Sequence, residues 1–132
     1  MKKYLKIILP VIILGLGLVF WKIKYSSPVN SSGTGSREQF ANLKISTGNS
    51  TQSIGVSAFV GKTALEATEA KAKVLANGTG TNAFVTSING TKADPGKREF
   101  WEFDVNGVES QVGAGTYIIK NHDEIEWKIS NY

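Results

Sequence analysis

An apolar segment near the N-terminus limits what this chain can fold into more than any other feature. Residues Ile7 to Trp21 run for fifteen positions without a charge. As a helix they would measure about 22 Å at ~1.5 Å per residue, and lysines at both ends can extend this toward the roughly 30 Å of a bilayer core. Segment 1–25 is therefore predicted to be an N-terminal transmembrane helix.

Two processing fates are compatible with segment 1–25. Signal cleavage needs small residues just before the cut, whereas this run ends in Phe20, Trp21, Lys22, Ile23 and Lys24. We therefore favour an uncleaved signal anchor, with secretion after cleavage as the alternative. Three lysines precede the run and two follow it, so the positive-inside rule predicts a single-pass protein of the cell membrane with its C-terminal domain extracytoplasmic.

A linker is predicted to follow the anchor. The stretch "SSPVNSSGTGS" consists of Ser, Gly, Pro, Thr and Asn with one valine, which is too little apolar surface to offset the entropy lost on folding. We assign residues 26–38 to this linker and residues 39–132 to one folded domain. A domain of this length has room for a single small core.

The charges exclude a nucleic-acid-binding domain. The chain has a formal charge of +4, but five of its fifteen basic residues flank the apolar segment, leaving ten against all eleven acidic residues in 37–132. No basic stripe with interleaved aromatics remains there. The chain also has no cysteine and one histidine, which excludes disulfides, thiolate metal sites and multi-histidine metal sites.

Local patterns predict two strands and then a helix in the first half of the domain. The segments 43–47 and 53–61 are rich in β-branched residues and are joined by the polar turn "GNSTQ". Thr63 and Glu66 have the spacing of a capping box. They predict a helix over 64–75, ended by Asn77–Gly78, with an apolar stripe of Leu65, Thr68, Ala72 and Leu75.

Further strands are predicted in the second half. They are "NAFVTSI" (82–88), the strand 100–105, "VESQV" (108–112), "TYII" (116–119) and "DEIEWKIS" (123–130). Asn89–Gly90 and Asn106–Gly107 are predicted to be tight turns, because Asn-Gly is the strongest short hairpin signal. The expected fold class is α+β and β-grasp-like, with one helix packed on a small, mostly antiparallel sheet.

The residue inventory predicts that the protein is not an enzyme. His122 lies in the predicted turn "NHDE", and no GxSxG-type nucleophile elbow accompanies it. Glu99, Glu102, Asp104 and Glu109 could be read as a carboxylate pair or a calcium site. Their alternation with apolar residues is explained more simply as the solvent-facing side of a strand, so we predict no metal site and no catalytic residue.

The order of five motifs gives a more specific indication. A helix carrying "ALEATEAKA" is followed by "FVTSING", "REFWEFDVNG", "VGAGTY" and "DEIEW". This series, over roughly residues 52–130, resembles the transcobalamin-like C-terminal domain of bacterial surface proteins, which is similar to the β-domain of intrinsic factor and transcobalamin. The chain departs from the usual Lys-Asp-Gly-Asp turn at Asn121–His122, where Asn and His tolerate the left-handed region that Gly normally occupies.

The resemblance implies ligand binding. In the cobalamin carriers this domain covers one face of the corrinoid. The resemblance therefore implies that the ligand contacts here are Trp101, Glu102 and Phe103, with Phe84 and Val85 as further candidates. The implied ligand is cobalamin-like or another soluble compound, and the chain has no resident cofactor. The carriers complete the site with a helical domain that has no counterpart here, so a separate partner protein is the implied substitute.

A structural role is the alternative. The same domain could act as an adhesive or spacer module at the cell surface without a small-molecule ligand, pairing with other proteins through an exposed sheet edge. The exposure of Trp101 and Phe103 separates the two hypotheses. Exposed aromatics in a concavity favour ligand binding, and complete burial favours the structural role.

Overall fold

The computed structural model describes residues 37–132. The predicted anchor at 1–25 and residues 26–36 of the predicted linker lie outside the described residues and stay predictions. Within residues 37–132, no helix is both long enough and apolar enough to span a membrane.

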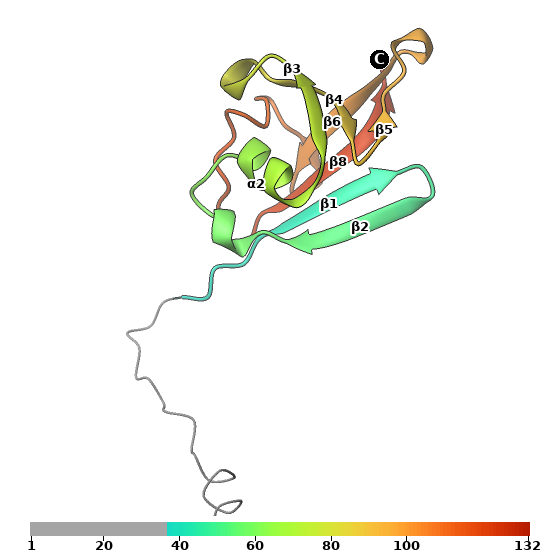
Figure 1. Ribbon diagram of the computed structural model, residues 1–132. Helices are drawn as coiled ribbons and strands as arrows, with labels where there is room; N and C mark the ends of the chain where they lie inside the picture. The colour runs from blue at the N-terminus through green and yellow to red at the C-terminus, as the bar shows by residue number, and fades with distance from the viewer. Residues whose placement is uncertain (1–36) are drawn as a thin grey trace, which may run out of the picture. The chain divides into compact units, whose positions relative to one another are not determined.

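The described chain forms two sheets and one α-helix (Figure 1). The strands and the helix are, in chain order, β1 (Asn42–Thr47), β2 (Ser50–Gly55), α2 (Ala64–Lys71), β3 (Val74–Asn77), β4 (Phe84–Ile88), β5 (Thr91–Lys92), β6 (Glu99–Val105), β7 (Val108–Glu109) and β8 (Glu124–Asn131). Three short 3₁₀ turns are η1 (Ser57–Phe59), η2 (Gly80–Asn82) and η3 (Pro95–Lys97). The α+β class is confirmed, but the prediction of a single sheet was wrong.

The larger sheet has the strand order β2-β1-β8-β6-β7. Its central pair, β1 and β8, is parallel, and its other pairs are antiparallel. The first and last strands of the described chain therefore lie side by side. Because side chains alternate along a strand, one face carries core residues such as Leu43 and Trp127 while the other carries polar residues such as Lys44 and Glu126.

The β1–β2 hairpin differs from its prediction. We expected a five-residue turn and a strand over 53–61, but β2 begins at Ser50 and ends at Gly55. The turn is only Gly48–Asn49, with Thr47 opposite Ser50. Gly48 has a φ of 58°, a left-handed conformation that a two-residue hairpin turn needs and that glycine adopts without strain. Residues 57–59 form the 3₁₀ turn η1 instead of a strand.

Helix α2 begins as predicted and ends early. Thr63 accepts from the Glu66 amide at 3.1 Å and donates its own amide to the Glu66 carboxylate at 2.8 Å, which is the predicted capping box. The helix ends at Lys71, so the predicted stop at Asn77–Gly78 was wrong. Beyond Lys71, the backbone of Lys73 binds Asn89 instead of a helical partner. The Asn89 side chain accepts from the Lys73 amide, and the Asn89 amide donates to the Lys73 carbonyl.

The segment predicted as the last helical turn is instead strand β3, which pairs with β4 and β5 in the smaller sheet. Leu65 and Thr68 are buried as the apolar stripe predicted, whereas Leu75 lies on β3 and is exposed. Ala and Leu favour a helix intrinsically, but pairing with β4 overrides that preference.

Both Asn-Gly turns are confirmed. Asn89 and Gly90 have φ of 51° and 82°, and Asn106 and Gly107 have φ of 52° and 82°, as a type I′ turn requires. The strand returning from Asn106–Gly107 covers only Val108–Glu109. The predicted strand 116–119 is not formed, and this segment contributes a single bridge between Thr63 and Ile118.

The core lies between the larger sheet and α2. Trp127 of β8 is buried, and its Nε1 donates to the Thr68 hydroxyl of α2 at 2.9 Å. The ring centroids of Phe103 and Trp127 are 5.1 Å apart, and those of Phe103 and Tyr117 are 6.0 Å apart. The motif aromatics thus form the contact between sheet, helix and the segment before β8.

Candidate functional site

Trp101 and Phe103 lie in the core. Their side chains are on the core face of β6, and the two residues are 4% and 8% exposed. Trp101 donates its Nε1 hydrogen to the Thr91 carbonyl at 3.2 Å, which joins the larger sheet to the smaller one. By the exposure criterion stated above, these two aromatics favour the structural hypothesis.

Glu102 lies on the opposite, polar face of β6. The Lys128 ammonium of β8 forms ion pairs with the Glu102 carboxylate at 3.3 Å and with the Asp104 carboxylate at 2.6 Å. A hydrogen bond from Ser130, and then the contacts with Asp104 and Lys128, hold the pKa of Glu102 below its usual value against the opposing effect of burial. The hydrogen bond to Asp104 is the largest cause that raises the pKa of Lys128. Glu102 is therefore already paired within the sheet.

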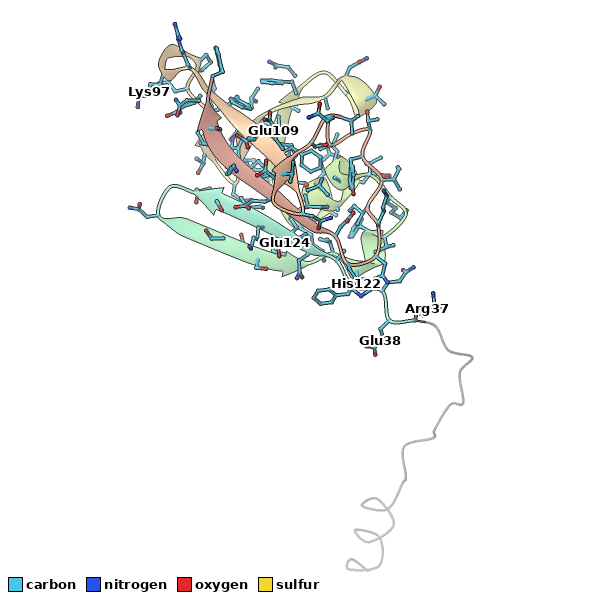
Figure 2. All side chains as sticks on the ribbon, turned by 180° about the vertical axis from the view of Figure 1, so that it is seen from behind. Arg37, Glu38, Lys97, Glu109, His122 and Glu124 are labelled. Carbon is cyan, nitrogen blue, oxygen red and sulfur yellow. The ribbon has the colours of Figure 1, made fainter. Side chains whose placement is uncertain are left out.

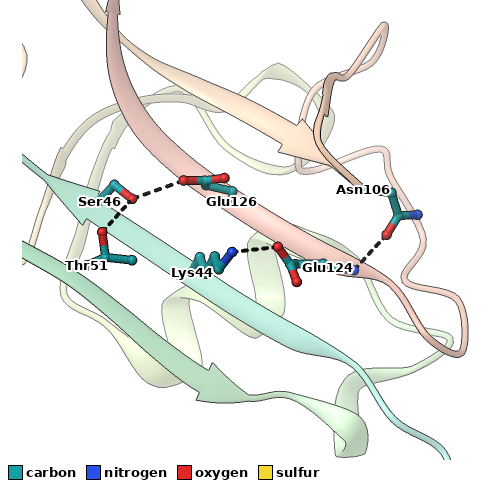
Figure 3. Close-up of polar contacts among 6 residues, drawn as sticks. All are labelled: Lys44, Ser46, Thr51, Asn106, Glu124 and Glu126. Carbon is teal, nitrogen blue, oxygen red and sulfur yellow. Dashed lines mark hydrogen bonds and ion pairs between the residues drawn. The ribbon is translucent and has the colours of Figure 1, made fainter.

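Polar contacts continue across the rest of this face (Figure 3). Lys44 donates to Glu124 at 2.7 Å, and Ser46 donates to Glu126 at 3.0 Å and contacts Thr51 at 3.2 Å. These contacts join β2, β1 and β8 on one surface. Glu102, Asp104, Glu124 and Glu126 are thus each paired with a cation or a hydroxyl. Asp104 is nevertheless only 2% exposed, so the prediction that it faces solvent was wrong. Among residues 37–132, no group of three potential ligands is arranged to hold a metal ion.

A second polar cluster surrounds Asp123. Its carboxylate accepts from the Tyr117 hydroxyl, the Asn106 side-chain amide and the Lys120 amide at 2.7, 3.0 and 2.8 Å. Burial raises the pKa of Asp123. The three hydrogen bonds together lower this pKa by more than burial raises it, so the pKa lies below its usual value. Burial and the bond to Asp123 raise the pKa of Tyr117 to about 12. The motif residues Asn106, Tyr117 and Asp123 therefore connect parts of the segment between β6 and β8 to one another.

His122 stays in a turn, as predicted. Its φ is 70°, and its amide donates to the Phe40 carbonyl. Figure 2 shows it at the end of the domain where Arg37 and Glu38 lead into β1, away from Lys97. The left-handed conformation at the Asn121–His122 departure is thus retained without glycine.

Phe84 and Val85 line a hollow beside β4. Phe84 is 57% exposed, whereas Val85 is buried. This β4 hollow has a volume of about 250 Å³. Its wall is formed by β3, β4, β5, the loop before β6 and the first residue of β6, through Asn77, Phe84, Val85, Thr86, Lys92, Ala93, Pro95 and Glu99. An exposed aromatic, a proline and two opposite charges therefore converge on one concave surface.

The charged wall of the β4 hollow is held by the loop 93–98. Asp94 caps this loop by accepting from the Gly96 amide at 2.9 Å, and the Glu99 carboxylate accepts from the Asp94 amide at 2.9 Å. Glu99 is thereby fixed at the edge of the hollow. Within residues 37–132, the Lys92 ammonium forms no ion pair, so its charge is available to a ligand.

A larger, more open hollow adjoins it at the β1–β2 turn. This hairpin hollow has a volume of about 620 Å³ and is lined by Ser46, Thr47, Gly48, Thr91, Lys92, Glu99, Lys128 and Ile129. Lys92 and Glu99 line both hollows. The two concavities are consequently neighbours that share one charged wall.

Sequence reasoning found part of the β4 hollow. It named Phe84 and Val85 as ligand contacts, considered Glu99 only as a carboxylate of a metal site, and missed Lys92 and Pro95. The stretch "TKADPGK" (91–97) contains charged residues, and its Asp-Pro-Gly order is a turn signal. Nothing in that signal shows which strand the loop faces.

Comparisons with known proteins place this geometry in context. The search of curated protein sequences gave no match. A proposed metal-binding protein from Ruminococcus gnavus ATCC 29149 is similar in structure, with a TM-score of 0.63 and 17% identity, over 72% of this chain and 99% of that chain. Haptocorrin in complex with Cbi is similar with a TM-score of 0.61 and 24% identity, over 81% of this chain.

The present chain spans 29% of the haptocorrin chain. At these identities the two likenesses concern the fold, so the chain has the fold of a segment of haptocorrin. A family model, "Domain of unknown function (DUF4430)", matches residues 61–131, which is more than half of the 132 residues. The chain therefore belongs to the DUF4430 family.

Proposed function

We propose that this protein is a membrane-tethered, extracytoplasmic ligand-binding module of the transcobalamin-like class, without catalytic activity. The observation that carries the proposal is the β4 hollow, in which exposed Phe84 faces a wall with Lys92 and Glu99. Small-molecule sites typically combine apolar surface with a few polar groups that fix orientation. The motif series in the sequence and the likeness to haptocorrin support the class.

The fold supports the finer β-grasp-like assignment. In the strand order β2-β1-β8-β6 the parallel pair is central, and α2 follows the first hairpin in the chain. The membrane tether rests on the sequence of residues 1–25, and the absence of catalysis rests on the residue inventory. Both are parts of the proposal.

The ligand that fits this hollow has a flat or apolar portion for Phe84 and a polar rim for Lys92 and Glu99. Cobalamin-like compounds are our first candidates, because haptocorrin was solved in complex with Cbi. A hollow of about 250 Å³ is below the roughly 300–1,000 Å³ of typical ligand pockets. A ligand of corrinoid size would therefore remain partly uncovered, which is the reason to expect a partner protein that completes the site.

Direct contacts from Trp101, Glu102 and Phe103 stay predictions. Burial of the two aromatics and pairing of Glu102 with Lys128 disfavour such contacts in the described conformation. Phe84 is the candidate contact that is both exposed and within a hollow.

Equilibrium dialysis of the full-length chain in detergent, with cobalamin and cobinamide, tests the proposal. Phe84→Ala should weaken binding about 10-fold or more, because a buried Phe contributes about 1.5–3 kcal/mol. Val108→Ala is the matched control, since Val108 is 68% exposed and lies outside both hollows. Absence of binding at millimolar ligand would dismiss the corrinoid version.

The structural or adhesive module is the second candidate. The specific observation in its favour is the burial of Trp101 and Phe103. The same dialysis with a panel of unrelated soluble ligands distinguishes it from the ligand-binding module. A purely structural module binds none of these ligands, and substitution of Phe84 then has no effect on binding.

A further inference from the structure

The outer edge of strand β2 is exposed, and it lies outside both hollows. In the larger sheet β2 lies on the outer side of β1, and Figure 1 shows it as the last strand on that side. None of residues 37–132 pairs with its other side. The backbone groups of an exposed strand edge are a template for pairing with another strand.

The register of the hairpin identifies which backbone groups face outward. The two-residue turn Gly48–Asn49 makes Thr47 and Ser50 a hydrogen-bonded pair, and such pairs alternate along an antiparallel ladder. The bond from the Val56 amide to the Ala41 carbonyl, at 2.8 Å, fits this alternation. The residues that direct both their N–H and their C=O away from β1 are therefore Thr51, Ser53 and Gly55.

The other strand edges in residues 37–132 are guarded. Strands β5 and β7 have two residues each, and their side chains include the charged Lys92 and Glu109. Strand β7 pairs only with Asp104 and Val105 of β6, and the remainder of β6 carries the charged Glu99 and Glu102. The register of β3 with β4 shifts between Leu75 and Ala76. Short length, charge and bulges are the usual devices that prevent edges from pairing.

Strand β2 has none of these devices. Its six residues pair with β1 without a register shift, and its sequence "STQSIG" contains no charged residue and no proline. All of its residues except Ile54 are exposed. This edge is thus long, regular and neutral, in contrast to the others.

We propose that β2 pairs antiparallel with β2 of a second copy of this chain, about a two-fold axis at Ser53. In this register Ser53 faces its own copy, Thr51 faces Gly55 of the copy, and Gly55 faces Thr51. Of the possible antiparallel registers, this one gives all three outward-facing residues a partner within the strand. The two larger sheets then form one continuous sheet with the polar faces on the same side.

Charge supports a second copy as the occupant. Two identical charged strands would repel each other, since like charges directly opposite are destabilising, and β2 carries none. A two-fold axis is also the commonest symmetry of protein dimers. Two six-residue strands bury less than the about 1,200 Å² at which standard interfaces begin, so the dimer is expected to be weak and is best trapped covalently.

Cysteine cross-linking of the full-length chain tests this register, because the natural sequence has no cysteine. In a hydrogen-bonded antiparallel pair the Cα atoms are about 5.5 Å apart, which suits a disulfide. Ser53→Cys should therefore form a disulfide-linked dimer when oxidised in its membrane or detergent preparation. The product is measured on a non-reducing gel.

Thr51→Cys is the matched control. It lies on the same strand and the same face, but in the proposed register its sulfur would be about 13 Å of strand length from its copy. We expect Ser53→Cys to cross-link at least about 10-fold faster. Equal cross-linking rates of the two variants would indicate association through another part of the chain and would overturn the proposal. A Ser53→Cys chain that stays monomeric, or that couples to a different protein, would also overturn it.

A second variant tests the backbone contribution. Thr51→Pro in the Ser53→Cys chain removes an outward-facing N–H without removing a backbone hydrogen bond to β1, a position at which proline is tolerated. It also removes the Thr51 hydroxyl from its contact with Ser46, so Thr51→Val in the same chain is the control for that loss. Thr51→Pro should lower the rate of cross-linking several-fold while the circular dichroism spectrum is unchanged. A folded double variant that cross-links as fast as Ser53→Cys alone would contradict strand pairing.

Discussion

At the scale of single residues, the aromatic and polar side chains of the motif series serve the core of this domain. Trp127 contacts Phe103 and donates to Thr68, and Asp123 gathers donors from three parts of the chain. In "DEIEWKIS", Ile125 and Trp127 alternate with charged residues, and both are buried in β8. The pairing of Trp127 with a helix threonine could not be predicted, because it depends on how α2 lies against the sheet.

Trp127→Ala should lower the free energy of unfolding by about 3–5 kcal/mol, as large-to-small substitutions of buried aromatics do. Urea unfolding followed by circular dichroism measures this loss. Trp127→Phe is the comparison, since it keeps most of the ring and loses the Nε1 bond to Thr68, at a cost of about 1–2 kcal/mol. If both substitutions cost under 1 kcal/mol, Trp127 is not a core residue.

The Tyr117–Asp123 pair should make stability depend on pH at both extremes. The pKa of Asp123 is lowered in the folded state, so its contribution is present above the unfolded value of about 3.9 and is lost as the pH falls through the folded value. The pKa of Tyr117 is raised to about 12. Its contribution is present below about pH 10 and is lost as the pH rises toward 12.

Tyr117→Phe separates the two contributions. The variant should be less stable than the natural protein at neutral pH, and the difference should shrink between about pH 10 and 12, where the natural protein loses the tyrosine contribution. It should also unfold at a higher pH on the acid side, because Asp123 has lost one donor. Urea unfolding at matched pH values measures both effects, and a difference that is constant from pH 4 to 12 would contradict them.

At the scale of elements, local signals predicted starts and turns better than ends. The capping box at Thr63 and Glu66 and both Asn-Gly turns are confirmed. The end of α2 was placed four residues late, at 75 instead of Lys71. Hydrogen bonds from Asn89, sixteen residues away from Lys73, decide where the helix ends, and no local pattern contains that information.

Thr63→Ala should destabilise the domain by about 0.5–2 kcal/mol, since it removes the acceptor for the Glu66 amide. Thr63→Ser keeps the hydroxyl and is expected to stay within about 0.5 kcal/mol of the natural protein. The comparison is made by thermal or urea unfolding of the two variants. An equal loss in both would mean that the threonine methyl group, and not the cap, stabilises this position.

At the scale of the whole molecule, the fold and the candidate site depend on parts of the sequence that only partly overlap. The motif series contains the core aromatics and the Asp123 cluster. Phe84 and Glu99 also belong to that series, but Lys92 and Pro95 come from the segment between two of its motifs, and the pairing of β4 with β5 brings Lys92 beside Phe84. A motif match therefore predicts the fold of this domain more directly than its ligand.

This division of roles leads to opposite phenotypes for two substitutions. Phe103→Leu, in the core, should lower the free energy of unfolding by about 1–1.5 kcal/mol and change ligand affinity less than twofold. Lys92→Ala, in the shared wall of the two hollows, should leave stability within about 0.5 kcal/mol and weaken ligand binding about 10-fold, the effect of losing one charge-assisted contact. Unfolding and equilibrium dialysis are measured on the same preparations. If Phe103→Leu weakened binding tenfold at unchanged stability, the ligand would contact the start of β6, as the resemblance to the cobalamin carriers implies, and the β4 hollow would not be the main site.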